Sequence, residues 1–157
     1  LMVFLSLPLP LLGQTPGQRI PSRERVHAEY INNIMGGINK TRADWGERFE
    51  DDDLENLMAI YSSDAPVILP GEGPLYGRDA IRAYWEEALP GLGATDTGLG
   101  DLDASGQMAM VAGSYSLERR QGNGAIVRES GGLITVFEQV GRDWLIRAQV
   151  FSGPGAG

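Results

Sequence analysis

The sequence predicts an α+β domain in which a curved antiparallel sheet wraps around N-terminal helices. Apolar residues recur mainly at helical spacing up to Leu89, whereas the spacing changes to every second residue after Gly100. Helices followed by an antiparallel meander pack as two layers around one core. With 157 residues, the chain has room for one domain of ordinary size whose core needs no disulfide or metal.

A long helix is expected first. From Arg23 onward, apolar residues recur about every four positions as far as Phe49, which is typical of a helix with one buried face. The pair Gly36-Gly37 predicts an interruption of this helix, because glycine is unfavourable in a helix interior.

Two shorter helices are expected next, with a brief strand between them. The aspartate run 51–53 supplies an N-cap and a favourable charge at the start of the second helix. The strand covers 65–69, and a third helix begins at Gly77 and ends at Pro90.

Three strands are expected in the second half of the chain. They cover residues 108–117, 126–138 and 144–151, which are rich in β-branched and aromatic side chains. Asn123-Gly124 and the segment 141–143 supply the turns between them.

The N-terminal residues differ in composition from the rest of the chain. Residues 1–12 are an apolar run, long enough for the core of a signal peptide and too short to cross a bilayer as a helix. We expect 1–22 to be a signal-like or anchoring segment plus linker, 23–152 to be the folded domain and 153–157 to be a disordered tail. The expected location is exported or membrane-associated, periplasmic in a bacterium, with the cytoplasm as the alternative.

Composition restricts the possible partners and chemistry. The net charge of -8 repels phosphate backbones, so we expect no nucleic-acid partner. The chain has no cysteine and a single histidine, His27, so thiolate chemistry is excluded and histidine chemistry is scarce. Helix capping explains the aspartates 51–53, whose side chains point in different directions, and we expect no metal and no cofactor.

Several short motifs in the folded part form a recognisable set. They are 60–65 (IYSSDA), Leu69-Pro70, 77–81 (GRDAI) with Tyr84-Trp85, 113–117 and 141–146 (GRDWLI). This set resembles the SnoaL-like and ketosteroid isomerase-like domains of the nuclear transport factor 2-like superfamily. The resemblance covers roughly residues 43–152. It implies a cone-shaped fold whose bent sheet and helices enclose an apolar cavity, with acidic or phenolic groups inside it in catalytic members.

The resemblance also implies where catalytic residues would lie. The general base of the ketosteroid isomerases is an aspartate just before the proline that ends the first strand, and Leu69 stands there in this chain. Their oxyanion-binding aspartate corresponds to Leu133 or Ile134. The His/Asp pair of the dehydratases has no counterpart, since His27 lies far upstream. Because leucine and isoleucine transfer no proton, we expect no catalytic residue at these positions.

A ligand-binding set is predicted instead. Arg147 and Gln149 alternate with apolar residues on the last strand, so they are expected to share one face with Leu145 and Phe151. A buried Arg147 would need an anionic partner, such as Glu138, Glu129 or a ligand carboxylate. The alternatives are an exposed strand face or a dimer interface for these polar residues, and core packing for the aromatic ones. The full set is Trp45, Tyr61, Tyr76, Trp85, Tyr115, Arg147, Gln149 and Phe151.

Three functions remain open. The one we favour, because the usual acid and base are missing, is a non-catalytic module that binds a small apolar ligand or a protein partner. The second is an accessory subunit of a membrane-associated assembly, tethered through residues 1–12. The third is an isomerase, cyclase or hydrolase that acts on a small apolar substrate through Tyr115, Asp64 or Glu138. Homodimers formed through the outer sheet face are common among similar domains, so a homodimer is a further expectation.

Overall fold

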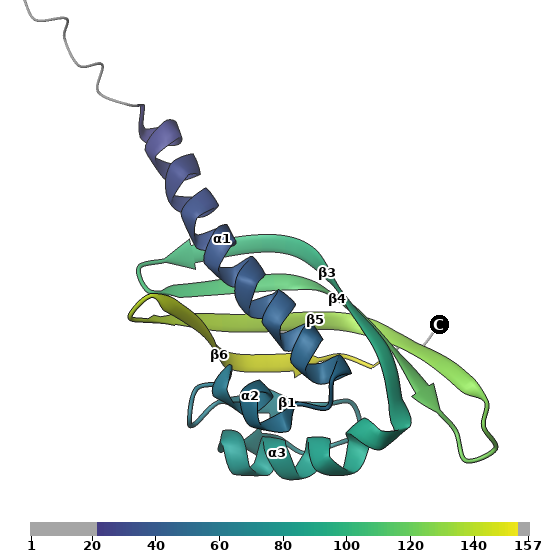
Figure 1. The fold of residues 1–157 in the computed structure, drawn as a ribbon. Helices are drawn as coiled ribbons and strands as arrows, with labels where there is room; N and C mark the ends of the chain where they lie inside the picture. The colour runs from purple at the N-terminus through teal and green to yellow at the C-terminus, as the bar shows by residue number, and fades with distance from the viewer. Residues whose placement is uncertain (1–21, 154–157) are drawn as a thin grey trace, which may run out of the picture.

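The computed structural model describes residues 22–153 (Figure 1). The predicted N-terminal segment therefore lies outside the described residues except for Ser22, as does the predicted tail except for Gly153. The elements, in chain order, are α1 (Arg23–Glu50), α2 (Leu54–Ala59), β1 (Pro66–Ile68), β2 (Leu75–Tyr76), α3 (Gly77–Ala88), a 3-10 turn (Leu89–Gly91), β3 (Leu92–Ser105), β4 (Met108–Arg120), β5 (Ile126–Val140) and β6 (Asp143–Phe151).

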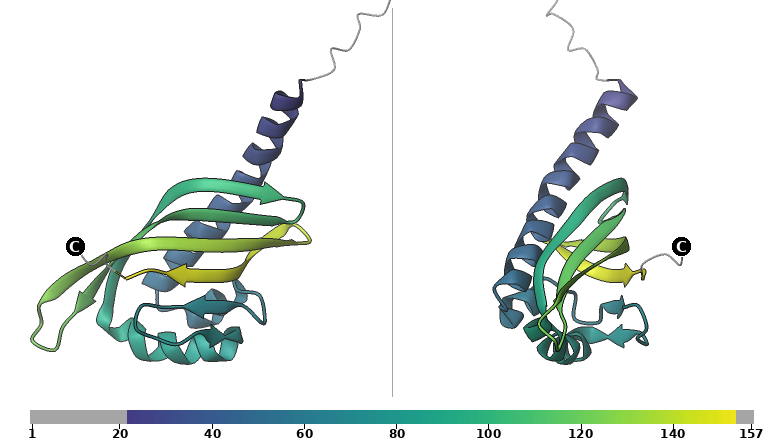
Figure 2. Two further views of the ribbon diagram at one scale, coloured as in Figure 1. Left: turned by 180° about the vertical axis from the view of Figure 1, so that it is seen from behind. Right: turned by 90° about the vertical axis from the view of Figure 1, so that its right-hand side faces the viewer.

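The predicted α+β cone is confirmed. A single curved sheet lies over α1, while α2 and α3 close one end (Figure 2). The strand order is β2-β1-β6-β5-β4-β3, and β3 to β6 form an antiparallel meander. The sheet is not wholly antiparallel as predicted, because β1 runs parallel to β6, with Val67 opposite Gln149. The long connection between these two strands allows a parallel pair, which a hairpin cannot form.

Helix α1 is continuous, so the predicted interruption at Gly36-Gly37 is wrong. Ser22 caps its N-terminus by accepting a hydrogen bond from the backbone N–H of Arg25. Gly37 lies directly against the indole of Trp144, where a Cβ would come within 2.4 Å of Cδ1. The glycine therefore permits close packing of α1 on β6, and that packing outweighs its low helix propensity.

The short helix α2 begins at the predicted aspartate run. Asp53 is the N-cap, since its side chain accepts a hydrogen bond from the backbone N–H of Asn56. Leu57 and Met58 of this helix are buried, and Ile81 of α3 joins them in the core. The two helices thus cover the end of the sheet at β1.

Strand β3 was not predicted, because its sequence is rich in glycine and aspartate. It nevertheless pairs with β4 along nearly its whole length, with a register shift between Gly98 and Asp101. At this shift a Cβ on Gly100 would lie 1.6 Å from the carbonyl oxygen of Ala112, so the two backbones approach too closely for any side chain. The two-residue strand β2 was not predicted either.

Candidate functional site

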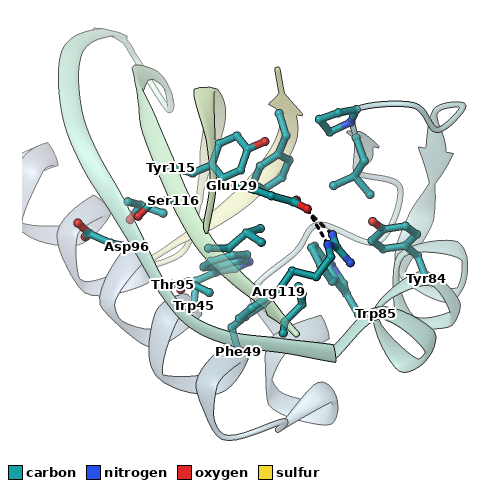
Figure 3. Close-up of a pocket in the computed structure, with 16 residues that line it drawn as sticks. Trp45, Phe49, Tyr84, Trp85, Thr95, Asp96, Tyr115, Ser116, Arg119 and Glu129 are labelled. Atoms are coloured by element: carbon teal, nitrogen blue, oxygen red, sulfur yellow. Dashed lines mark hydrogen bonds and ion pairs between the residues drawn. The ribbon is translucent and has the colours of Figure 1, made fainter. Parts of the chain in front are cut away.

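A cavity lies between α1, α3 and the inner face of the sheet (Figure 3). The volume of the cavity is about 80 Å³. The wall is largely aromatic, with two aromatic side chains from α1, two from α3, one from β4 and one from β6. They are Trp45, Phe49, Tyr84, Trp85, Tyr115 and Phe151.

The aromatic rings hold one another in place. Trp45 stacks on Phe49 with ring centroids 4.9 Å apart, and Phe49 meets Trp85 edge-on at 5.0 Å. On the sheet side, Tyr115 meets Phe151 edge-on at 5.2 Å. Offset stacking and edge-to-face contacts are the favoured aromatic arrangements, so the wall is a fixed apolar surface.

Polar and charged side chains lie at the mouth of the cavity. Arg119 donates from Nε and Nη2 to the two carboxylate oxygens of Glu129, at 2.8 and 3.4 Å. This hydrogen bond is the main reason why the pKa of Arg119 is raised. Burial raises the pKa of the Tyr84 phenol, an effect that the neighbouring Arg119 charge partly offsets. The mouth thus carries a guanidinium, a carboxylate and a protonated phenol.

A chain of buried hydrogen bonds runs behind the cavity wall. Trp45 Nε1 donates to the Tyr61 hydroxyl at 2.8 Å, and this hydroxyl donates to Gln149 Oε1 at 2.7 Å. Gln149 Nε2 reaches Thr135 Oγ1 at 3.5 Å. Burial raises the Tyr61 pKa far above its ordinary value, against the smaller effect of the N–H groups of Trp45 and Trp85. Tyr61 is therefore a neutral hydrogen-bond donor at physiological pH rather than a base.

The indole N–H of Trp85 is the exception among the buried polar groups. Its Nε1 has no hydrogen-bond partner within residues 22–153, although it lies toward the Tyr61 oxygen. The Tyr61 oxygen already accepts a hydrogen bond from Trp45, and the Trp85 N–H is left without one.

The expectation that Arg147 and Gln149 share a face is wrong, because β6 contains a β-bulge. Phe137 pairs with Ile146 and Val136 with Ala148, which leaves Arg147 as an extra residue. A bulge reverses the alternation of side chains that follow it. Gln149 therefore faces inward, whereas Arg147 does not.

Arg147 takes its partners outside the cavity. It bonds Asp64 at 3.2 Å and lies 3.7 Å from Glu138, one of its expected partners. Glu138 follows the buried Phe137 on β5, so it points away from the inner face. The structure thus brings Asp64 and Glu138 together through Arg147, and it places neither beside Tyr115.

The predicted ligand-binding residues fall into three groups. Four of them, Trp45, Trp85, Tyr115 and Phe151, line the cavity. Tyr61 and Gln149 lie behind the wall in the hydrogen-bonded chain. Arg147 and Tyr76 lie elsewhere, and Tyr76 is 71% exposed. That any of them touches a ligand stays a prediction.

Sequence reasoning did not assign Arg119 to the site, and it considered Glu129 only as a partner of Arg147. Both lie on the inner face of the β4–β5 hairpin, close to the Asn123-Gly124 turn. The sequence does contain a signal for this pair. Arg119 and Glu129 carry opposite charges on either side of a predicted hairpin turn, and such residues meet across antiparallel strands.

The positions of the missing isomerase residues are apolar and mostly buried. Leu69 lines the cavity and is 6% exposed, so a base at this place would have faced a ligand. Leu133 is also buried, while Ile134 is on the other face of the sheet and 43% exposed. Within residues 22–153, no group of three His, Asp or Glu side chains could hold a metal ion.

Comparison with known proteins assigns the family. A family model described as SnoaL-like domain matches residues 43–142. The chain belongs to the SnoaL-like domain family. No curated protein matches the sequence.

Solved structures support the same fold for this SnoaL-like chain. A ketosteroid isomerase-like protein from Erwinia carotovora atroseptica superposes with a TM-score of 0.67 and 14% identity, over 76% of this chain and 95% of that one. An NTF2-like protein with a cystatin-like fold from Novosphingobium aromaticivorans superposes with a TM-score of 0.68 and 15% identity, over 90% and 94%. At these identities the likeness concerns the fold alone.

Proposed function

We propose that this SnoaL-like domain is a non-catalytic module that binds a small apolar ligand in the aromatic cavity. The family and fold support a ligand-binding or isomerase-like domain in general. The observation that carries the narrower proposal is the wall of six aromatic side chains, with three charged side chains, Asp96, Arg119 and Glu129, among the described lining residues. Concave sites with apolar walls and a few polar groups are typical of small-molecule binding.

Most of the polar side chains in and behind the cavity wall are already paired, which supports ligand binding rather than proton transfer. Arg119 and Glu129 neutralise each other, and the Tyr61 phenol is neutral and already hydrogen-bonded to Gln149. Leu69 stands where the isomerases have their base. A general base needs a free proton acceptor within reach of the substrate. Of the two carboxylates among the described lining residues, Glu129 is paired with Arg119, and Asp96 is exposed to solvent.

Binding of α-methylstyrene, a hydrocarbon of one aromatic ring, tests the proposal. It is measured by chemical-shift changes of the Trp45 and Trp85 indole N–H signals in NMR titrations. Leu69→Trp fills the cavity from its wall and should abolish these changes. Tyr76→Trp, which adds the same side chain at an exposed site, should leave them intact. Unchanged indole signals in the native protein up to the solubility limit of the hydrocarbon would contradict the proposal.

A second observation favours a protein partner, namely another copy of this chain. The outer face of the sheet carries a row of apolar side chains, since Ile68 pairs with Val150 and Val150 with Ile134. These three are 39%, 37% and 43% exposed, and Met110 beside them is 42% exposed. A contiguous apolar face of this kind marks an interaction surface. We propose that two copies pack through it.

Tethering to a membrane through residues 1–12, and a role as an accessory subunit of a membrane-associated assembly, stay proposals. In the described part of the chain, no helix has the length and apolar character needed to cross a membrane.

A further inference from the structure

We propose that Glu129 sets the charge selectivity of the cavity: by occupying Arg119, it favours uncharged, oxygen-bearing apolar molecules over the corresponding carboxylates. The inference rests on the proposed function, because it concerns the polar end of a ligand whose apolar part fills the cavity. Arg119 and Glu129 both line this cavity.

The charged side chains that line the cavity lead us to expect weak binding of carboxylates. Among the described lining residues, Arg119 is the one cation, while Asp96 and Glu129 are two carboxylates. The Arg119 and Glu129 side chains are 39% and 36% exposed, so water screens them only partly. A ligand carboxylate would therefore have to displace Glu129 from Arg119, against the repulsion of the Glu129 carboxylate itself. That exchange replaces one charged pair by another and gains little.

The same geometry leaves donors for an uncharged oxygen. A guanidinium has five N–H groups, and Glu129 accepts from only two of them. Figure 3 shows the Tyr84 hydroxyl turned toward the same guanidinium, so a phenol lies beside these donors. A carbonyl or hydroxyl oxygen at this place accepts a hydrogen bond without having to displace Glu129.

Three ligands of nearly the same shape separate these effects. α-Methylstyrene, acetophenone and benzoate each have a benzene ring with a planar substituent of three heavy atoms. The substituent is a hydrocarbon group in α-methylstyrene, a neutral carbonyl group in acetophenone and a carboxylate in benzoate. In the native protein we expect acetophenone to bind at least as tightly as the hydrocarbon. We expect benzoate to bind at least about tenfold more weakly than acetophenone, because like charges brought together cost more than 1 kcal/mol.

The decisive variant is Glu129→Gln, which keeps the side-chain shape and removes the charge. Benzoate should then bind about tenfold or more tightly than before, since Arg119 becomes available for a bidentate pair. Acetophenone affinity should change less than about threefold. Glu118→Gln is the matched control, because Glu118 forms the equivalent 3.0 Å ion pair with Arg128 on the same hairpin without lining the cavity. It should leave all three affinities unchanged.

The outcomes distinguish the two proposals. If none of the three ligands binds the native protein, both proposals are wrong. If the hydrocarbon and acetophenone bind but Glu129→Gln does not strengthen benzoate binding, the selectivity inference is wrong and the ligand-binding function stands. Equal affinities of acetophenone and benzoate for the native protein would also overturn the inference, and this measurement does not depend on the folding of any variant.

Discussion

At the scale of single residues, the Tyr61 hydroxyl links two other buried side chains of the core. It accepts from Trp45, donates to Gln149 and is completely shielded from solvent. Trp45 also forms part of the cavity wall, so this hydroxyl fixes a side chain that lines the cavity. The stability of the fold and the shape of the cavity therefore depend on the same hydrogen bonds.

The first prediction concerns loss of this hydroxyl. Tyr61→Phe leaves the Trp45 N–H and the Gln149 carbonyl buried without their partner, and should lower the free energy of unfolding by about 3 kcal/mol in urea denaturation. Tyr30→Phe is the control, because the Tyr30 hydroxyl donates to the Gly106 carbonyl at an exposed position. It should cost under about 1 kcal/mol. Equal effects of the two substitutions would contradict the importance of the buried chain.

The second prediction concerns alkaline pH. The Tyr61 pKa is raised in the folded protein above its ordinary value near 10, so the folded state retains this proton where the unfolded state loses it. This contribution is fully present below pH 10 and decreases as the pH rises above it, by up to about 1.4 kcal/mol per pH unit. Urea denaturation between pH 9 and 11 should show a shallower decrease for Tyr61→Phe than for the native protein. If the unfolding free energies of the two proteins decreased equally with pH, Tyr61 would not be the source of this pH dependence.

At the scale of elements, close approach of the backbone decides where glycine is required. Gly37 of α1 lies against Trp144, whereas its neighbour Gly36 is exposed, and a Cβ added there would have no neighbouring atom within 4 Å. The two glycines look equivalent in the sequence. Their different surroundings follow from the side of α1 that packs on β6.

The third prediction uses this difference. Gly36→Ala should raise the unfolding free energy by about 0.5–1 kcal/mol, because alanine is favoured in an exposed helix interior. Gly37→Ala should lower it by about 1–3 kcal/mol, because the new methyl group meets the Trp144 indole. Thermal unfolding monitored by circular dichroism shows whether each substitution raises or lowers the stability. A stabilising Gly37→Ala would show that α1 does not need this close contact.

At the scale of the whole molecule, the two proposed binding surfaces lie on opposite faces of the sheet. The inner face carries the cavity, and the outer face carries the apolar row that includes Ile68, Ile134 and Val150. A ligand and a second copy of the chain would therefore bind without competing for the same surface.

The fourth prediction tests the second copy. Sedimentation analysis of the native protein should show a dimer, and Ile134→Asp should give a monomer with an unchanged circular dichroism spectrum, because a buried, unpaired charge opposes association. Val26→Asp on α1, at a side chain that is 52% exposed, should leave the dimer intact. A native monomer at high concentration would rule out this interface.

Much of the fold could be predicted because it depends on local patterns. Periodicity identified the three helices and three of the strands of the meander, and the expected turns contain Gly124 and Gly141, both with positive φ. Strand β3 was missed because its residues have low β propensity, and only its pairing with β4 makes it a strand. The aromatic wall could be predicted in part, since Trp45 and Trp85 lie on periodic apolar faces of helices.

The family, the α+β class and the apolar nature of Leu69 follow from the sequence alone, because each depends on residues that are near one another in the chain. Three further features emerge only in three dimensions: β1 is parallel to β6, a bulge turns Arg147 outward, and Arg119 pairs with Glu129. These features depend on the register between strands. A shift of one residue moves a side chain to the other face of a sheet, and no local pattern in this chain specifies that register.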